Sequence, residues 1–298
     1  MYAIICQDLT KTYGKKTALD HVSFTIAKDA ITGLVGRNGA GKTTLLKCIA
    51  GFLHPDSGDI RVFEQNPYDN LAVSAGLIFV DESMNFPEGQ TLAEIFALYR
   101  RFYPGWTQDL AEKLLDYFNL PPTQLPNKLS KGMLSTFRAI LGLCAHAPLT
   151  IMDEPTSGMD SGVRQDFYRA LLKDYIACPR TFLISTHLLA EIEDLLEYIL
   201  LIDRGKALLS APVTDVSDYA LRLSGPSERL QPFLEERTVL HQGLPLADYL
   251  PVTVINDFTE AERLEMEKAG ISCSGVSLND FCIALTAPTK GGIDRVFT

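Results

Sequence analysis

The feature that most constrains the fold of this chain is a glycine-rich segment, GRNGAGKT, at residues 36–43. It continues from an apolar run at residues 30–36 that is typical of a buried parallel strand, and it passes into residues 42–50, whose apolar side chains have helical spacing. In this context the pattern G-x-x-x-x-G-K-[ST] predicts a loop whose backbone N–H groups cradle phosphates at the start of a helix. The alternative, a plain glycine turn between strand and helix, explains less of the pattern.

Two side chains of this segment have predicted roles of their own. Lys42 is expected to reach the β- and γ-phosphates of a nucleotide, and the Thr43 hydroxyl is expected to bind Mg²⁺. The residues of the loop expected to contact the nucleotide are Gly36, Arg37, Asn38, Gly39, Ala40, Gly41, Lys42, Thr43 and Thr44.

Two further apolar runs end in polar side chains. Residues 149–154, LTIMDE, finish with Asp153 and Glu154, and residues 181–187 finish with Ser-Thr-His187. The carboxyl ends of strands in a nucleotide-binding parallel sheet lie beside the ligand. Asp153 is therefore expected to hold the Mg²⁺ shell and Glu154 to orient or deprotonate the attacking water, whereas the alternative is an acidic helix cap. A neutral His187 is expected to hydrogen-bond a γ-phosphate oxygen, and the alternative there is a structural histidine.

The net charge and the cysteine pattern limit the classes of partner and the cellular compartment that are expected for this chain. The 298 residues include 27 Lys plus Arg and 37 Asp plus Glu, a net charge of −10, which argues against nucleic acid as a partner. The six cysteines have neither C-x-x-C nor zinc spacing, so free thiols in a reducing compartment are expected. The most apolar long window, residues 134–152, is interrupted by Arg138, His146 and Pro148 and predicts a buried helix and strand rather than a membrane span. With no signal-peptide pattern at the N-terminus, a cytoplasmic chain is expected.

The order of the predicted elements divides the chain into two domains. Strands alternating with helices over residues 1–212 predict a largely parallel α/β sheet, interrupted by a helical subdomain over about residues 84–148. Thr91 and Glu94 predict a capping box that opens a helix to Phe102. Further expected elements of this domain are strands at 18–26, 149–153 and 181–185, helices at 108–120, 134–146 and 162–177, and a hairpin of 198–204 with 206–210.

The last part of the chain, residues 213–298, predicts a small α+β domain. Strands are expected at 220–224, 238–240, 252–255 and 271–276, and helices at 227–236, 259–269 and 278–285. This order, βαββαβα, suggests a ferredoxin-like arrangement.

Two more segments complete a pattern that resembles a known family. Residues 129–133, LSKGM, resemble the LSGGQ signature of the ATP-binding cassette (ABC) family, and residues 153–160, DEPTSGMD, resemble its D-E-P-T-x-x-L-D run. Tyr13 matches the aromatic residue that stacks on adenine in this family, and His187 matches its switch histidine. Residues 1 to about 210 therefore resemble the nucleotide-binding subunit of an ABC transporter, in particular cassettes that pair with separate exporter-type (ABC-2-like) membrane subunits. The resemblance implies a P-loop NTPase cassette with a mixed sheet core and a helical subdomain, binding ATP and Mg²⁺.

The resemblance also implies a mechanism. Two cassettes, forming a homodimer or a related heterodimer, close head to tail around two ATP, and hydrolysis separates them. In each site, one subunit supplies the phosphate loop together with Tyr13, Asp153, Glu154 and His187. The opposite subunit supplies Ser130 and Gly132 and the helix that follows them. Asp160, in the D-loop, is also expected to bind the nucleotide. A groove beside the helical subdomain transmits the motion to an integral membrane permease.

Three positions depart from the family pattern. Lys131 replaces the first glycine of the signature and Met133 replaces its glutamine. The segment 77–83, LIFVDES, lacks the glutamine that the family has at the end of a strand before the helical subdomain. Glu82 is the expected substitute and metal ligand there, and Asp81 is the alternative.

Three functions fit these motifs to different degrees. The leading one is the ATPase subunit of a transporter, held on the cytoplasmic face of the membrane by its permease, with export favoured over import by the signature resemblance. A soluble ABC ATPase without transport is the alternative, but the chain lacks the second cassette or the long coiled coil that such proteins carry. A degenerate regulatory cassette is disfavoured because Glu154 and His187 are both present.

Overall fold

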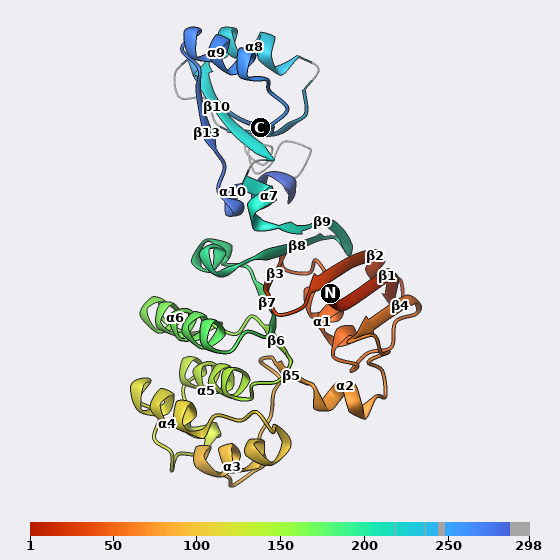
Figure 1. The fold of residues 1–298 in the computed structure, drawn as a ribbon, viewed down its shortest axis with the longest axis vertical. Helices are drawn as coiled ribbons and strands as arrows, with labels where there is room; N and C mark the ends of the chain where they lie inside the picture. The colour runs from red at the N-terminus through yellow and green to blue at the C-terminus, as the bar shows by residue number, and fades with distance from the viewer. Residues whose placement is uncertain (218, 236, 244–247, 287–298) are drawn as a thin grey trace. The chain divides into compact units, whose positions relative to one another are not determined.

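The computed structural model describes residues 1–217, 219–235, 237–243 and 248–286 (Figure 1). The chain divides into two compact units, Met1–Ser210 and Ala211–Thr298. The strands of the first unit are β1 (Tyr2–Tyr13), β2 (Lys16–Ala27), β3 (Ile31–Val35), β4 (Ser57–Val62), β5 (Leu77–Val80), β6 (Leu149–Asp153), β7 (Thr181–Thr186), β8 (Tyr198–Asp203) and β9 (Lys206–Pro212), the last of which runs into the second unit. Its helices are α1 (Lys42–Ile49), α2 (Leu71–Ala75), α3 (Leu92–Phe102), α4 (Gln108–Tyr117), α5 (Lys131–Cys144) and α6 (Ser161–Ala177).

The main sheet of the first unit has the strand order β5-β6-β7-β3-β8-β9. The pairs from β5 to β8 are all parallel, and β9 follows β8 after a two-residue turn. Every residue of β3, β5, β6 and β7 is buried, as expected for parallel strands covered on both faces. The predicted strands and hairpin are confirmed, and because β6, β7 and β3 are neighbours, the three predicted functional segments begin at adjacent strand ends.

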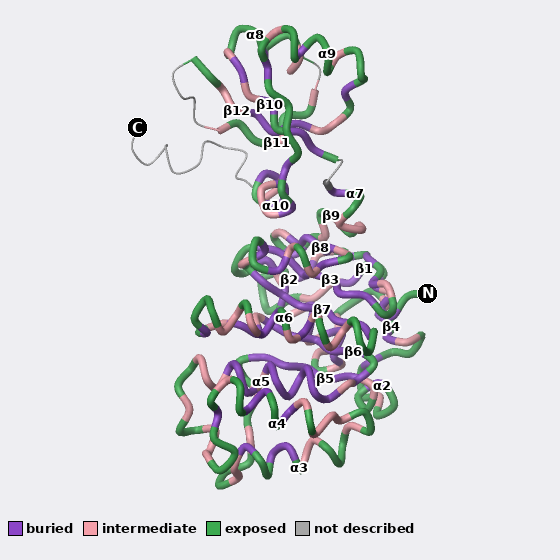
Figure 2. Tube along the Cα trace, turned by 60° about the vertical axis from the view of Figure 1, so that its left-hand side comes forward, coloured by how far each residue is buried: buried purple, intermediate pink, exposed green. Residues whose placement is uncertain are grey.

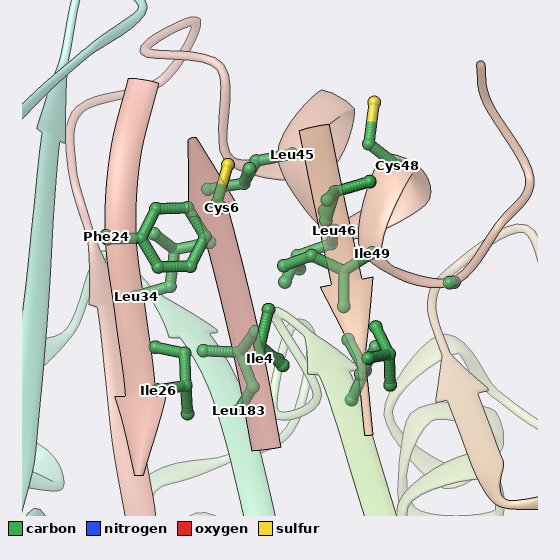
Figure 3. Packing of buried hydrophobic residues seen from close by; sticks show 14 of the residues in the cluster. Ile4, Cys6, Phe24, Ile26, Leu34, Leu45, Leu46, Cys48, Ile49 and Leu183 are labelled. Carbon is green, nitrogen blue, oxygen red and sulfur yellow. The ribbon is translucent and has the colours of Figure 1, made fainter. Parts of the chain in front are cut away.

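A smaller antiparallel sheet, with the order β2-β1-β4, shares a hydrophobic core with the main sheet and α1. The buried side chains labelled in Figure 3 come from both sheets and from this helix: Ile4, Cys6, Phe24, Ile26, Leu34, Leu45, Leu46, Cys48, Ile49 and Leu183. Helix α1 therefore has apolar partners on both sheets, and its N-terminus, where the phosphate loop ends, is held by the packing of its last two turns. None of the six cysteines, all within the described residues, forms a disulfide.

The helical insert lies between β5 and β6 and contains α3, α4 and α5. The predicted capping box is confirmed, with the Thr91 side chain accepting from Glu94 N and Glu94 bonding back to Thr91. Helix α4 ends at Tyr117, earlier than predicted, because Asn119 adopts a left-handed φ of 54° and reverses the chain. Helix α5 begins at Lys131, three residues earlier than predicted, because the Ser130 side chain caps it. In Figure 2, α5 is mostly buried whereas α3 and α4 expose one face.

The second unit is a four-stranded antiparallel sheet with the order β11-β12-β10-β13. Its elements are α7 (Val213–Ser217), β10 (Ala220–Pro226), α8 (Ser227–Leu234), β11 (Val239–Gln242), β12 (Tyr249–Ile255), α9 (Glu260–Lys268), β13 (Ser272–Gly275) and α10 (Leu278–Thr286). Its core includes Leu221, Leu223, Val252 and Val254 from the sheet and Leu230 and Met266 from the helices. The predicted order βαββαβα is confirmed. The predicted end of its first helix, Glu236, lies outside the described residues. No described helix of the chain is long and apolar enough to cross a membrane.

A buried ionic cluster joins the ends of α5 and α6 to the start of β7. Asp174 accepts from His146 Nε2 at 2.9 Å and from Arg180 Nη2 at 2.6 Å, and Arg180 also donates to Leu143 O at 2.8 Å. Burial alone would raise the pKa of Asp174, but the His146 hydrogen bond and the charge of Arg180 outweigh it and hold the pKa below its ordinary value. The carboxylate form of Asp174 therefore stabilises the folded state.

We predict that Asp174→Asn lowers the free energy of unfolding at pH 7 by about 3–5 kcal/mol, because it leaves the Arg180 charge without its buried partner. Since the folded-state pKa of Asp174 is depressed, the wild-type advantage is complete above the unfolded pKa of about 4 and is lost as the pH falls through the folded pKa. Urea unfolding curves at pH 7 and at decreasing acidic pH should show the two proteins converging. Asp109→Asn, which removes an exposed pair with Lys113, is the control and should leave the unfolding midpoint unchanged at both ends of this range. A constant difference from pH 7 to strong acid would contradict the assignment.

Candidate functional site

The phosphate-loop segment forms a tight turn between β3 and α1. Gly41 caps α1 with a φ of 111°, and a Cβ there would lie 2.5 Å from Ala18 O. A Cβ on Gly36 would lie 2.3 Å from Ile202 O. Both positions therefore require glycine, because the loop passes directly against the backbone of β2 and β8.

A cavity of about 370 Å³ opens at this loop. Its lining residues are Tyr13, Lys16, Ala18, Arg37, Asn38, Gly39, Gly41, Lys42, Thr43, Thr44, Asp153 and Glu154. Most of the predicted contact residues are brought together here. Gly36 and Ala40 are buried and are not in the lining, and Lys16 and Ala18 are additions that the loop pattern could not indicate, because they come from the hairpin partner of Tyr13.

Lys42 is the cation at the base of this cavity. Its side chain is only 7% exposed, and its Nζ donates to Gly36 O at 2.7 Å and lies 3.3 Å from Glu154 Oε1. A buried ammonium group held by one carbonyl and one carboxylate is a fixed point charge in the lining of this cavity. It can bind phosphate oxygens with little loss of side-chain freedom.

A chain of hydrogen bonds connects the ends of β6 and β7 to α1. Thr43 Oγ1 donates to Asp153 Oδ2 at 2.6 Å, and Ser185 Oγ donates to Asp153 Oδ1 at 2.5 Å. Ser185 Oγ also accepts from Glu154 N at 2.9 Å. Thr43 and Asp153 thus present adjacent oxygen atoms, which are the ligands that Mg²⁺ prefers.

Ser185 is the residue whose contribution the sequence did not reveal. It is fully buried and paired with Asp153 in the parallel ladder, and its hydroxyl orients both the carboxylate of Asp153 and the backbone of Glu154. Its position in the Ser-Thr-His segment at the end of β7 was the only sequence feature that pointed to it. That feature is weak, because serine is common at strand ends.

Glu154 lies immediately beyond β6 with a left-handed φ of 50°. The Glu154 side chain lies between the Lys42 ammonium group and the His187 imidazole. Its Oε1 is 3.3 Å from Lys42 Nζ, and its Oε2 is 2.6 Å from His187 Nδ1. His187 is about half exposed at the end of β7. A carboxylate oriented by an imidazole at the mouth of a phosphate-binding cavity has the geometry of a general base for water.

Ser130, Gly132 and Asp160 lie together at a second cavity, also of about 370 Å³. Ser130 caps α5 and Asp160 caps α6, each accepting from a backbone N–H of the first turn. A Cβ on Gly132 would lie 2.5 Å from Gly158 O, so the start of α5 packs directly on the turn before α6. The structure therefore divides the predicted contact residues between two separate cavities of the same unit.

The two acidic residues after β5 differ in their surroundings. Asp81 is buried and accepts from Ser83 Oγ at 2.7 Å, whereas Glu82 is exposed. Neither lines the cavity at the phosphate loop. Asp81 directly follows the last residue of β5, Val80, which pairs with Met152 next to Asp153 in β6, so Asp81 is the nearer of the two acidic residues to this strand end.

Comparisons with known proteins identify the cassette. Residues 19–157 match the ABC transporter family. The ABC transporter ATP-binding protein YtrB of Bacillus subtilis (strain 168) is 30% identical over 63% of this chain and 64% of its own length. The bacitracin transport ATP-binding protein BcrA of Bacillus licheniformis is 31% identical over 69% of this chain and 68% of its own length. The chain belongs to the ABC transporter family.

The fold agrees with this membership. The solved structure of an ATP-binding subunit of an ABC transporter matches with a TM-score of 0.64 at 25% identity, covering 72% of this chain and 91% of that one. The first unit is thus an ABC cassette with the P-loop NTPase fold, and the protein is an ATP-binding subunit and ATPase of this family. The chain spans about two thirds of the length of the two curated relatives named above.

We predict that Lys42→Ala lowers ATP turnover by at least about a hundredfold, because it removes the one buried cation at the centre of the phosphate loop. Phosphate release under saturating Mg-ATP measures this. Lys47→Ala is the matched control, since Lys47 lies on the same helix outside the cavity and should retain wild-type turnover. Wild-type activity in Lys42→Ala would overturn the role assigned to this side chain.

Proposed function

We propose that this protein is the motor subunit of a transporter, in which two cassettes close head to tail over two ATP and drive a solute outward through a separate membrane subunit. The observation that carries the proposal is the division of the site between two cavities. One cavity holds the phosphate loop, Asp153 and Glu154, and the other holds Ser130, Gly132 and Asp160. Each cavity has groups suited to one side of a triphosphate, so a second copy or a related cassette completes both.

In the first half-site, the roles follow from position. Tyr13 at the rim of the cavity stacks on adenine, and the loop residues 36–44 cradle the phosphates, with Lys42 on the β- and γ-phosphates. Glu154 accepts a proton from the attacking water, and His187, hydrogen-bonded to Glu154, reaches the γ-phosphate.

The residues that would hold Mg²⁺ are Thr43 and Asp153, whose oxygens are 2.6 Å apart. Two protein oxygens suit Mg²⁺, which takes the rest of its octahedral shell from water and phosphate oxygens. When bound, the ion would neutralise charge on the β- and γ-phosphates. Of the two candidates after β5, the buried Asp81 is better placed than Glu82 to accept a hydrogen bond from this shell.

In the second half-site, Ser130 and Gly132 expose the N-terminus of α5 toward the γ-phosphate of the opposite subunit, where a helix N-terminus favours negative charge. Lys131, which replaces the family glycine, lies with its aliphatic carbons against Gly158. This packing explains how the substitution is accommodated without filling the cavity, whose lining includes Ser130 and Gly132 but not Lys131.

The permease contact is assigned to a third cavity, of about 480 Å³, beside the helical insert. Its lining is rich in apolar and aromatic side chains from α2, α3 and the segment between β5 and α3: Leu71, Ala75, Phe86, Pro87, Leu98, Tyr99, Phe102 and Tyr103. An apolar face of a membrane subunit's cytoplasmic helix fits this groove, and docking there would hold the cassette on the cytoplasmic face of the membrane.

Residues 213–298 are proposed to be a separate ferredoxin-like domain, with residues 1–212 as the ATP-binding domain and about 84–148 as its helical subdomain. This boundary lies two residues beyond the division between the two compact units. Supporting the assignment, β10 and β11 flank the antiparallel β12, and β13 pairs with the other edge of β10, which is the strand order of a split βαβ fold.

We predict that Glu154→Gln binds ATP but hydrolyses it roughly a hundredfold or more slowly, and that it accumulates as a dimer in saturating Mg-ATP, because it loses the proton acceptor and leaves the phosphate-loop residues in place. Light scattering with and without Mg-ATP measures the mass. Glu112→Gln, an exposed substitution outside both cavities, should return to monomer after turnover. A Glu154→Gln protein that stays monomeric would count against the sandwich.

We also predict that Phe102→Asp abolishes co-purification with the permease while leaving ATP binding intact. Phe102 is 67% exposed in the groove, and Ile176→Asp, at a side chain 70% exposed on α6, is the matched control. The full chain is purified from its host in mild detergent, and the co-purifying proteins are identified.

Recovery of a stoichiometric integral membrane protein, lost only with Phe102→Asp, would support the transporter assignment. A second, different cassette would indicate a heterodimer. Only soluble partners, with the protein absent from the membrane fraction, would instead favour a soluble ABC ATPase.

A further inference from the structure

The end of β1 that carries Tyr13 lacks a strand on one of its sides. Tyr13 pairs with Lys16 across the hairpin to β2, but the pairing of β1 with β4 stops at Thr10, opposite Ser57. The last residues of β1 therefore form a two-stranded ribbon that extends beyond the three-stranded sheet. Such a ribbon is marginally stable by itself. Yet Tyr13, about half exposed, must remain at the rim of the nucleotide cavity if it is to hold a base.

Asp56 takes the place of the missing strand. Its backbone N–H donates to Thr10 O at 2.8 Å, which extends the ladder by one bond. Its Oδ2 then accepts from Thr12 N at 2.7 Å and from Thr12 Oγ1 at 2.6 Å. A carboxylate thus supplies the acceptor that a further residue of β4 would have provided, and it fixes the backbone directly before Tyr13.

The Lys11 side chain bonds to Asp56 and to the segment before it. Its Nζ donates to Asp56 Oδ1 and to His54 O, each at 2.8 Å, and it lies 6.0 Å from the centroid of the Tyr13 ring. Residues two apart on a strand share a face, so Lys11 and Tyr13 lie side by side. The hydrogen bonds from Lys11 and then Thr12 hold the pKa of Asp56 well below its usual range, and the carboxylate is ionised at neutral pH.

We propose that Asp56, with Lys11, is a positioning device for Tyr13 that sets the affinity of the cassette for the base of the nucleotide. The inference rests on the proposed stacking of adenine on Tyr13. Neither Asp56 nor Lys11 lines the cavity, so both act through Tyr13. The device therefore governs binding of the base and leaves binding of the phosphates to the loop at residues 36–44.

The test compares a ligand with a base to a ligand without one. Dissociation constants of the full chain for ADP are measured by titration calorimetry, and those for inorganic pyrophosphate by displacement of ADP. Complete loss of base–aromatic stacking weakens binding by roughly 5- to 150-fold. We expect Asp56→Ala to weaken ADP binding about three- to tenfold, less than complete loss of stacking would, and to leave pyrophosphate binding unchanged. Asp56→Asn, which keeps an acceptor for Thr12, should show a smaller loss.

Asp59→Ala is the matched control, because Asp59 lies three residues further on, in β4, and is similarly exposed. Its backbone pairs with Gln7 of β1, but its side chain bonds Arg61 and not a backbone group of β1. It should bind both ligands like the wild type. In a Tyr13→Ala background, Asp56→Ala should have no further effect on ADP, since the residue that it positions is gone.

Three results would overturn the proposal. Equal weakening of ADP and pyrophosphate by Asp56→Ala would mean a general structural effect. Unchanged ADP binding in Asp56→Ala, with a loss in Tyr13→Ala, would refute the positioning role and leave the stacking role of Tyr13 intact. Unchanged ADP binding in Tyr13→Ala would refute the stacking role and this inference together.

Discussion

The packing of α1 is the constraint on which the functional site depends. Leu45, Leu46 and Ile49 are completely buried in a core that both sheets of the cassette share. Because a close-packed core allows a helix little freedom to shift, the first turn of α1 and the loop before it have a fixed position relative to β6 and β7. Thr43 then meets Asp153, and Lys42 meets Glu154, at distances set by the sheet and the helix together.

Most of the cassette core was predictable because its elements have strong local signals. The buried strands read as continuous apolar runs, and α3 begins with a capping box that the sequence shows directly. The antiparallel β1 and β4 were harder to delimit, since their alternation is interrupted by bulges near Gln7 and Lys11. The five-residue α2 was not predicted at all, because a helix of little more than one turn has too few positions to show a period.

The side of the site at the phosphate loop was predictable for a different reason. Lys42, Asp153 and Glu154 follow strands that a parallel sheet brings to one edge, so their proximity follows from topology. The position after β5 could not be settled in this way, because Asp81 and Glu82 are consecutive and only the end of the strand decides which one is buried. The contributions of Ser185 and Asp56 could not be predicted from the sequence either, because each residue acts through hydrogen bonds to residues distant in the sequence.

The left-handed backbone of Glu154 has an evolutionary consequence. Asparagine and aspartate tolerate this conformation better than most residues, whereas β-branched residues do not. A descendant of this gene that exchanged Glu154 for Asn or Asp would shorten or neutralise the proposed general base while keeping a relaxed backbone turn. The backbone at this position therefore permits a cassette that keeps the phosphate loop and lacks the glutamate, with no loss of stability from this turn.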